Sequence, residues 1–524
     1  MTSGADPARL ENQPNDLLIF WEKLFSSQGN NVPFEELLRE FVHPARQKIE
    51  HCASPLLTES AIDDLEASLL KLIGGLLGQV LELQFSTYRG LAGPDANAYR
   101  SFISHLSTAG RSKALAGYPA LEPLVESVTP QWINSCGQLL QRLERDLQEI
   151  SSTLLDGRAT SKVERIECDL SDRHDDGQTV AVLRFASGSA VVYKPKQCDS
   201  DIVFHKLLAW LSERGAPSFH VPRLLLRGGY AWMEFVAQEP CTSEEQARLY
   251  YHRAGALLFA VYLLSGTDCH FDNVIACGEY PVLVDTETFY QPSIRTDADG
   301  YTVLSTGLVP GMPVAGCDAS GFGAQVPQPF RARIPRWADV NTARMKLSFE
   351  DATLFPQRNV PVFRGEPCGA AFNAKELLAG FEQAYRIALA HRSELFSGSR
   401  PLNDIENCRI RFLVRGTLDY YFTVNRALHL RNLRGTKELA IQLPELSGRH
   451  AVFQPLIGAE IETLRRLDIP RFATTAGSLD LGCPEATLAG CFAKTGYQRI
   501  VERVRGLGEE DLARQMALIR ICLA

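Results

Sequence analysis

The sequence predicts an α+β protein with two lobes, a small antiparallel sheet lobe and a larger helical lobe, together with an N-terminal helical region and additional helical segments. Apolar residues recur at helical spacing before residue 155, strand and turn patterns dominate from 163 to 236, and a long apolar helix pattern follows residue 243. These changes predict four divisions of the chain, which are 1–155 (helical region), 156–240 (sheet lobe), 241–400 (helical lobe) and 401–524 (one strand and C-terminal helices).

The composition is that of an ordinary globular protein without a basic surface. The chain has 524 residues, 45% hydrophobic and 22% charged, with a net charge of −8. We therefore expect neither nucleic acid nor an anionic membrane as a partner. The polar N-terminus is no signal peptide, and the apolar segment 69–83 predicts a buried helix rather than an integral membrane segment. The 13 cysteines include no CxxC pair, which favours reduced thiols and a cytoplasmic location.

Residues 1–155 are expected to form a helical scaffold. Apolar residues at three-to-four spacing predict helices over residues 34–49, 60–88, 97–107 and 131–154. None of these segments carries a cluster of catalytic residue types, so we expect structural roles for this part of the chain.

Two hairpin patterns make up the predicted sheet lobe. Strands are expected at 179–185, 190–193, 223–227 and 231–236, with a helix at 201–213. Lys194 directly follows the second of these strands. A small antiparallel sheet with a helix inserted after a strand lysine is typical of the nucleotide-binding lobe of kinase-like enzymes, where that lysine contacts phosphates.

Two further segments of the sheet lobe are candidates for nucleotide contacts. Asp172, His174 and Gly177 form a polar loop just before the first strand, which would cover phosphates, although a plain surface loop has the same composition. Residues 232–236, WMEFV, end the sheet at the position of a kinase hinge, where backbone groups meet adenine.

The segment 266–290, GTDCHFDNVIACGEYPVLVDTETFY, concentrates the residue types that phosphoryl transfer needs. A buried helix predicted from 243 to 264 leads into it. Its polar residues stand in the order Asp268, His270, Asn273, Asp285 and Glu287. An acid, an imidazole, an amide and a downstream acid would supply a base or orienting group for the attacking hydroxyl and oxygen ligands for Mg²⁺.

The segments after residue 290 are less regular. Residues 291–345 are rich in Gly and Pro and predict a long loop, either a substrate-facing segment or a disordered insertion. A helix is expected over 374–396, and helices with loops from 430 to the C-terminus.

A row of cationic residues is predicted near residue 411. Alternation places Arg409, Arg411, Arg415 and Thr417 on one side of a strand. Guanidinium groups that face one way suit a bound phosphate, whereas a solvated strand face paired with acids has the same spacing.

Asp268, His270 and Asn273 have a D-x-H-x-x-N spacing that resembles the phosphoinositide 3-kinase branch, not the HRD loop of ordinary protein kinases. This resemblance implies a lipid-kinase-like bilobal catalytic core. From about residue 60 to its end, the chain also resembles the dehydratase domain of class II lanthipeptide synthetases. The matching motifs are YPALEPL (118–124), SDRHDDGQTV (171–180), VVYKPK (191–196), WMEFV (232–236), DCHFDNVIACGEYPVLVDTET (268–288), VLSTGLVP (303–310), RFLVRGT (411–417) and DIPRF (468–472).

The resemblance implies an enzyme that uses ATP and Mg²⁺ to phosphorylate Ser and Thr of a ribosomally made precursor peptide with a leader. Elimination of the phosphate then leaves dehydroalanine or dehydrobutyrine. At the nucleotide, the resemblance implies that Lys194 binds the ATP phosphates, with Asp172 and His174 at their outer end.

The resemblance also implies roles in the metal site and in the two chemical steps. The residues implied at Mg²⁺ are Asn273 and Asp285, with Glu287 as a further metal or neighbouring group. Asp268 would orient or deprotonate the peptide hydroxyl, and His270 would support the transferred phosphoryl group. Arg411 and Thr417 match the pair tied to phosphate elimination, in which an arginine stabilises the leaving phosphate.

The chain departs from the family pattern in three places. Ser171 stands where the family often has Gly, and Gly416 stands where it often has Pro, which loosens the backbone beside Thr417. The Cys and His set that binds zinc in a cyclase domain is absent from the sequence. The chain is therefore expected either to be a stand-alone dehydratase with a separate cyclase as partner or to be an excised domain.

Two other classes of function compete with this one. A lipid-kinase-like enzyme that phosphorylates a peptide or a small molecule would stop at the phosphorylated product. A non-catalytic scaffold that binds peptide is the third class, and the complete set of phosphotransfer residues argues against it.

Overall fold

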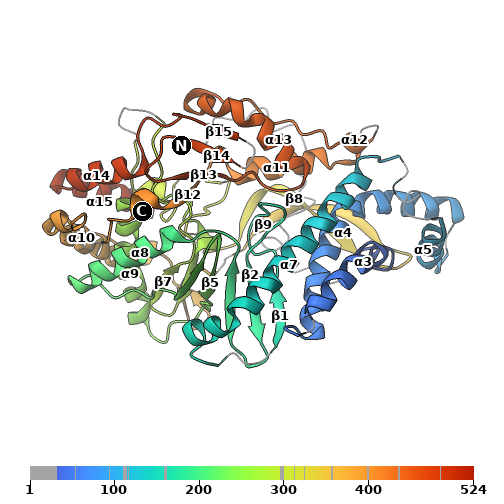
Figure 1. Cartoon of the computed structure of the whole chain (residues 1–524), viewed down its shortest axis with the longest axis horizontal. Coiled ribbons are helices and arrows are strands. Elements are labelled where there is room, and N and C mark those ends of the chain that lie inside the picture. Colours follow the sequence, from blue (N-terminus) through green and yellow to red (C-terminus); the bar gives the residue numbers. More distant parts are fainter. Residues whose placement is uncertain are drawn as a thin grey trace.

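The computed structural model is a mixed α/β fold in which small antiparallel sheets are joined to a larger set of helices (Figure 1). It describes residues 32–524 except 54, 94, 110–114, 116, 159–161, 295–299, 312, 315, 324, 356–357, 398–400, 435–436 and 484–485. The first 31 residues of the predicted helical region and parts of the segment 291–345 therefore lie outside the described residues.

The N-terminal region is helical, as its periodicity predicts. Its described helices are α3 (Glu35–Ala53), α4 (Glu59–Ala92), α5 (Ala98–Ala109) and α7 (Leu121–Leu154). The prediction of α7 began only after Pro130, whereas the helix starts at Leu121 and continues through the proline.

Helix α4 is, within the described part of the chain, the one helix long and apolar enough to cross a membrane. Its Leu69, Ile73, Leu77 and Leu81 are buried in the core that it shares with α3 and α7. A buried core helix meets the same criteria of length and composition, and this packing agrees with the predicted buried helix.

The sheet lobe contains five antiparallel strands in the order β1-β2-β3-β5-β4. They are β1 (Val163–Glu167), β2 (Ala181–Phe185), β3 (Ala190–Lys194), β4 (Leu224–Arg227) and β5 (Tyr230–Glu234), and helix α8 (Asp199–Glu213) follows β3. Both predicted hairpins and the inserted helix are confirmed. The edge strand β1 was not among the predicted strands.

Helix α7 covers one face of this sheet (Figure 1). Its buried Asp146 accepts hydrogen bonds from the Tyr230 hydroxyl at 2.6 Å and from the Trp232 indole N–H at 2.9 Å. Because side chains alternate along a strand, Val191 and Tyr193 of β3 pack on this side. Val192 packs on the opposite face, and Lys194 therefore points away from α7.

The helical lobe is built on α9 (Glu244–Leu263) and α10 (Ala374–Ala390), which pack side by side. Ser243 caps α9 at the predicted start of this helix, by accepting a hydrogen bond from the N–H of Gln246 at 3.2 Å. Glycines permit the close approach of the two helices. A Cβ at Gly255 would lie 1.9 Å from the carbonyl oxygen of Leu377, so a larger residue there would separate them.

A third hairpin packs against helix α9 and against the segment that ends the five-stranded sheet. It consists of β6 (Val274–Cys277) and β7 (Tyr280–Leu283), as the sequence predicts. Val236, which ends the predicted hinge segment, packs against Ile275 and Val282 of this hairpin. The exit from the sheet lobe thus lies directly on the hairpin that follows Asp268–Asn273.

The predicted loop over residues 291–345 is wrong in its last part. Gln328–Ala338 forms strand β8, which pairs with β9 (Lys346–Leu354) in a long two-stranded ribbon. Pro329 and Pro335 made this segment look irregular, but a two-stranded ribbon leaves outer edges where a missing N–H costs no ladder bond. A shorter ribbon follows, with β10 (Val362–Phe363) and β11 (Glu366–Pro367).

The C-terminal part contains a sheet that was not predicted. Strands β12 (Arg409–Phe412), β13 (Phe472–Thr475), β14 (Leu481–Cys483) and β15 (Ala486–Leu488) pair in that order. The helices here are α11 (Thr417–Ala427), α12 (Leu430–Leu433), α13 (Ile457–Arg465), α14 (Gly496–Gly506) and α15 (Glu509–Leu523). The expectation of helices and loops alone after residue 430 is therefore wrong.

The predicted row of cationic residues on one strand is also wrong. Strand β12 ends at Phe412, and Thr417 is the first residue of α11. The buried Arg415 donates to Glu460 of α13 at 2.8 Å, so it takes part in the packing of this region. Arg409 is exposed and Arg411 is buried, so only Arg411 is carried inward by the strand.

Candidate active site

The loop that carries Asp268 is held by its own polar residues. Asp268 has a φ of 62°, in the left-handed region that few residues other than glycine adopt. The side-chain amide of Asn273 donates to the carbonyl oxygen of Asp268 at 2.8 Å. His270 caps the short 3₁₀ turn Phe271–Asn273, because its Nδ1 accepts from the N–H of Asp272 at 3.3 Å. Asp268, His270 and Asn273, all predicted site residues, therefore take part in holding the conformation of this loop.

Asp285 lies beside this loop at the end of the β6–β7 hairpin. The N–H of Val284 donates to the carbonyl of Asn273 at 2.9 Å, which extends the hairpin pairing and brings Asn273 next to Asp285. One carboxylate oxygen of Asp285 accepts from the N–H of Glu287 at 3.1 Å. The two predicted Mg²⁺ ligands Asn273 and Asp285 therefore occupy adjacent positions at the strand end.

Two lysines reach the hairpin from strand β3 and its continuation. The ammonium group of Lys194 donates to the backbone carbonyl of Val284. Lys196 forms ion pairs with Asp285 at 2.6 Å and with Glu287 at 3.2 Å. Burial alone would lower the pKa of Lys196, but the two carboxylates raise it above its ordinary value. Lys196 was missed, although the VVYKPK motif contains it.

Glu287 is surrounded by cations. Its carboxylate accepts from Arg411 Nη1 at 3.1 Å and from Arg471 Nη2 at 3.2 Å, in addition to its ion pair with Lys196. Burial would raise the pKa of Glu287, but Lys196, Arg411 and Arg471 hold it well below its ordinary value. The backbone N–H of Arg411 also donates to the carbonyl of Glu287 at 2.7 Å. Strand β12 is thereby attached to the acidic loop.

Asp172 and His174 lie next to Arg411. The Tyr421 hydroxyl donates to Asp172 Oδ1 at 2.5 Å, and Arg411 Nη2 is 3.9 Å from Asp172 Oδ2. His174 Nε2 is 4.0 Å from the same carboxylate oxygen. Thr417 precedes Tyr421 by one turn of α11 and lies on the same helix face. The structure thus places Thr417 one turn away from the residue that bonds to Asp172.

His174 is neutral at physiological pH. Its Nδ1–H donates to the carbonyl of Ile469 at 2.7 Å, which leaves Nε2 without a proton and directed toward Asp172. Burial, together with the positive charge of Arg411, lowers the pKa of His174 from 6.5 to about 4.

This shift predicts that the protein loses stability in mild acid. The unfolded chain binds a proton at His174 near pH 6.5 and the folded chain only near pH 4, so the contribution of His174 is complete above pH 6.5 and is lost as the pH falls toward 4. The loss amounts to about 3 kcal/mol. Melting temperatures measured between pH 7 and pH 4.5 should fall more steeply for the wild type than for His174→Gln. Parallel curves would contradict the assignment.

Asp268 shares one electrostatic environment with residues from distant parts of the chain. Burial raises the pKa of Asp268 above its ordinary value, the neighbouring His270 and Arg411 oppose this, and the carboxylates of Asp172 and Asp285 add to it. Three acids from different segments therefore lie around Arg411 of β12. They are Asp172 before β2, Asp268 of the D-x-H-x-x-N loop, and Asp285 after the β6–β7 hairpin. A half-buried carboxylate with a raised pKa is suited to accept a proton.

The structure adds three residues to those that the sequence predicted. These are Lys196, Tyr421 and Arg471. Each lies within a motif or run that the sequence showed, namely VVYKPK, the aromatic run at 420–422 and DIPRF. Their contacts link segments that are 89 or more residues apart, so local spacing could not single them out.

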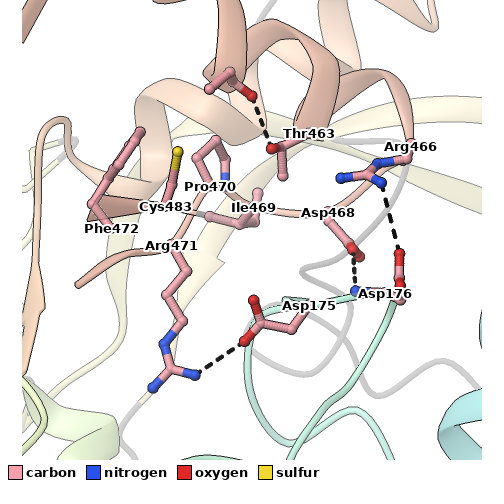
Figure 2. A pocket seen from close by; sticks show the side chains of 11 residues that line it. Asp175, Asp176, Thr463, Arg466, Asp468, Ile469, Pro470, Arg471, Phe472 and Cys483 are labelled. Carbon is pink, nitrogen blue, oxygen red and sulfur yellow. Dashed lines mark hydrogen bonds and ion pairs between the residues drawn. The ribbon is translucent and has the colours of Figure 1, made fainter. Parts of the chain in front are cut away.

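A pocket of about 220 Å³ opens on the outer side of this group, between the loop at Asp175 and the segment before β13 (Figure 2). Arg471 extends past this pocket. Its guanidinium bonds to Asp175 at 3.2 Å on the pocket side and to Glu287 at 3.2 Å on the other. Arg471 thus connects the pocket lining with the charged group around Glu287.

Comparisons with known proteins place these motifs in a family. Residues 118–475 match the family described as "Domain of unknown function (DUF4135)". The lacticin 481/lactococcin biosynthesis protein LcnDR2 of Lactococcus lactis subsp. lactis is 24% identical over 493 residues, covering 88% of this chain and 52% of the relative. The chain thus spans about half the length of that relative. Because the family match covers more than half of the chain and includes all the predicted site residues, the protein belongs to the DUF4135 family.

Proposed function

We propose that this chain dehydrates Ser and Thr of a ribosomally made precursor peptide, by phosphorylation from ATP and subsequent elimination of the phosphate. One observation carries the proposal. The Arg411 guanidinium donates a hydrogen bond to Glu287 and also interacts electrostatically with Asp268 of the Asp268–Asn273 loop. A phosphotransfer loop and a buried arginine in one group provide for both making and expelling a phosphate. The similarity to LcnDR2 supports a lanthipeptide-related role.

A lipid-kinase-like bilobal core is part of the proposal. Three features of the fold support it: the five-stranded sheet with a lysine at the end of β3, the helical lobe around α9, and the connecting segment at Val236. A nucleotide would lie between the sheet face that carries Lys194 and the β6–β7 hairpin.

The charges of the group support a requirement for Mg²⁺. Five carboxylates (Asp172, Asp175, Asp268, Asp285 and Glu287) are set against four cations (Lys194, Lys196, Arg411 and Arg471). The group therefore has no surplus positive charge to neutralise a triphosphate. Asn273 and Asp285 offer the amide and carboxylate oxygens that Mg²⁺ prefers, and Mg²⁺ usually takes its remaining ligands from phosphates and water. When bound, it would neutralise phosphate charge.

In the phosphorylation step, Asp268 and His270 would act on the peptide hydroxyl and the phosphoryl group. The raised pKa of Asp268 suits a carboxylate that orients the hydroxyl and accepts its proton. Because Nδ1 of His270 accepts a hydrogen bond from Asp272, its Nε2 carries the proton and is a donor for phosphate oxygens.

In the elimination step, Arg411 would stabilise the departing phosphate. Its guanidinium is buried and lies between Glu287 and Asp172, which raise its pKa and keep it charged. Thr417, one helical turn before Tyr421, would act beside it. We place the reaction in the cytoplasm, because ATP and the 13 free cysteines fit a reducing compartment. A cyclase would then form the thioether rings.

Mass spectrometry of a precursor peptide coexpressed with this chain tests the function. A short peptide with a Ser-, Thr- and Cys-rich tail, if one is encoded beside the gene, would be the substrate to test. The expected products have lost one water per modified site. Accumulation of stable phosphopeptide in the wild type would instead establish the kinase without elimination. An unmodified peptide in the presence of ATP and Mg²⁺ would contradict both.

A further inference from the structure

The loop between His174 and Gln178 has an unusual backbone. His174 and Gln178 pair through two backbone hydrogen bonds of 3.1 and 2.8 Å. The three residues between them are all left-handed, with φ values of 48° for Asp175, 65° for Asp176 and 76° for Gly177. Only glycine adopts this region without cost, so two consecutive aspartates here need a compensating interaction.

The carboxylate of Asp468 supplies that interaction (Figure 2). It accepts the backbone N–H of Asp176 at 2.9 Å and that of Gly177 at 3.0 Å. Asp468 is 1% exposed, and its nearest cation is Arg173, at 3.9 Å. A Cβ at Gly177 would lie 2.4 Å from Arg173 Nη2, so the glycine is required both by its backbone and by this neighbour.

Successive N–H groups in such a turn form a concave site for an anion. In a loop that binds nucleotide, phosphate oxygens fill that site. Here the Asp468 carboxylate fills it, so the tip of the loop is turned toward the C-terminal sheet. Because the N–H groups at the tip bond to Asp468, any contact of this loop with phosphate would come from Asp172 and His174 at its base.

The same segment holds the rest of the loop. The N–H of Ile469 donates to the carbonyl of Arg173 at 2.8 Å, and the carbonyl of Ile469 accepts from His174 Nδ1 at 2.7 Å. Four residues later the segment has become strand β13, where Ala473 is the register partner of Arg411. One short segment therefore fixes the positions of Asp172 and His174 relative to Arg411.

We propose that Asp468 is a positioning residue, which fastens the loop Asp172–Gln178 to the C-terminal sheet and keeps Asp172 and His174 aligned with Arg411 for the elimination step. This inference rests on the proposed function. Losing the contact to Asp468 would disturb Asp172 and His174 in both steps. Lys194, Asp268 and Asp285 are held by other segments and still serve phosphorylation, whereas elimination needs the alignment with Arg411 and should lose more.

Asp468→Asn tests this inference, because the amide has a similar size but offers one acceptor where two N–H groups converge. The two steps are assayed separately. Phosphorylation is measured with the precursor peptide and MgATP, and elimination with a synthetic precursor that carries one phosphoserine and MgADP. We expect kcat for elimination to fall at least tenfold more than kcat for phosphorylation. A loss of folded protein alone would lower both by the same factor.

Asp64→Asn is the matched control. Asp64 also accepts a backbone N–H, that of Ile166 at 2.9 Å, and also pairs with an arginine, Arg165 at 2.8 Å, but it holds the sheet edge away from the site. We expect it to lower the melting temperature and to leave the ratio of the two rates unchanged. Asp468→Ser, which keeps one acceptor, serves as a milder variant if the asparagine variant does not fold.

Three results would overturn the inference. Equal losses in both steps for the Asp468 variants would show a purely structural role, and so would a shift of the ratio in Asp64→Asn. If the wild type does dehydrate its peptide, either of these results refutes the positioning role of Asp468 and leaves the proposed function intact. A wild type that releases no dehydrated peptide would refute both.

Discussion

Replacing Asp268 with asparagine is expected to slow peptide phosphorylation by about 10²–10⁴-fold, the range over which a positioned proton acceptor contributes to catalysis. Asparagine keeps the size of the side chain and its place in the left-handed turn, but it cannot accept the proton of the peptide hydroxyl. The carboxylate is half-buried and near two other acids, so removing its charge also relieves repulsion, and the fold should be retained or slightly stabilised. The measurement is the rate of phosphate incorporation with precursor peptide and MgATP.

Asp272→Asn is the control for this variant. Asp272 lies in the same loop, and its N–H, rather than its carboxylate, bonds to His270. The side chain of Asp272 is exposed, and we expect the phosphorylation rate of Asp272→Asn to stay within a few-fold of the wild-type rate. If Asp268→Asn retained the wild-type rate while Asp272→Asn did too, Asp268 would have no part in the proton transfer and the kinase-like mechanism would be wrong as drawn.

The candidate catalytic loop was predictable because its residues lie close together in the sequence. Asp268, His270 and Asn273 lie within one turn of chain, and a tight hairpin returns Asp285 to them. The same holds for the hairpins of the sheet lobe, where each strand pairs with its neighbour in sequence or with the next strand but one. Alternation and turn residues suffice for such elements.

The partners of Glu287 could not be predicted in this way. They come from positions 196, 411 and 471, and no local pattern relates them. The sequence also could not show which of Lys194 and Lys196 pairs with the acids. Pro195 stands between them, so alternation along β3 cannot be extended to tell which ammonium reaches the acids.

The C-terminal sheet was missed for a different reason. Strands β12 and β13 have four residues and β14 has three, too short to show a period of two. β12 pairs with a strand some 60 residues away, after intervening helices. The arginine row therefore looked like one long strand, although the chain turns into α11 after Val414-Arg415-Gly416.

Replacing Arg411 with lysine is expected to leave peptide phosphorylation largely intact and to lower the rate of phosphate elimination by about 10²–10³-fold, the usual cost of losing a donor that stabilises a departing anion. The guanidinium extends between two carboxylates, with Nη1 3.1 Å from Glu287 and Nη2 3.9 Å from Asp172. A lysine ammonium is a single point of charge and cannot span both positions. Lys196 and Arg471 still neutralise Glu287, so the variant should fold.

The expected product of Arg411→Lys is phosphopeptide, detected by mass spectrometry, where the wild type yields dehydrated peptide. Arg409→Lys is the control, because Arg409 lies on the same strand but is exposed to solvent. It should dehydrate as the wild type does. Wild-type dehydration by Arg411→Lys would remove the arginine from the elimination step. If Arg411→Lys and Asp268→Asn instead stopped at the same unphosphorylated peptide, the two residues would serve one step. The division of labour between the D-x-H-x-x-N loop and strand β12 would then be refuted.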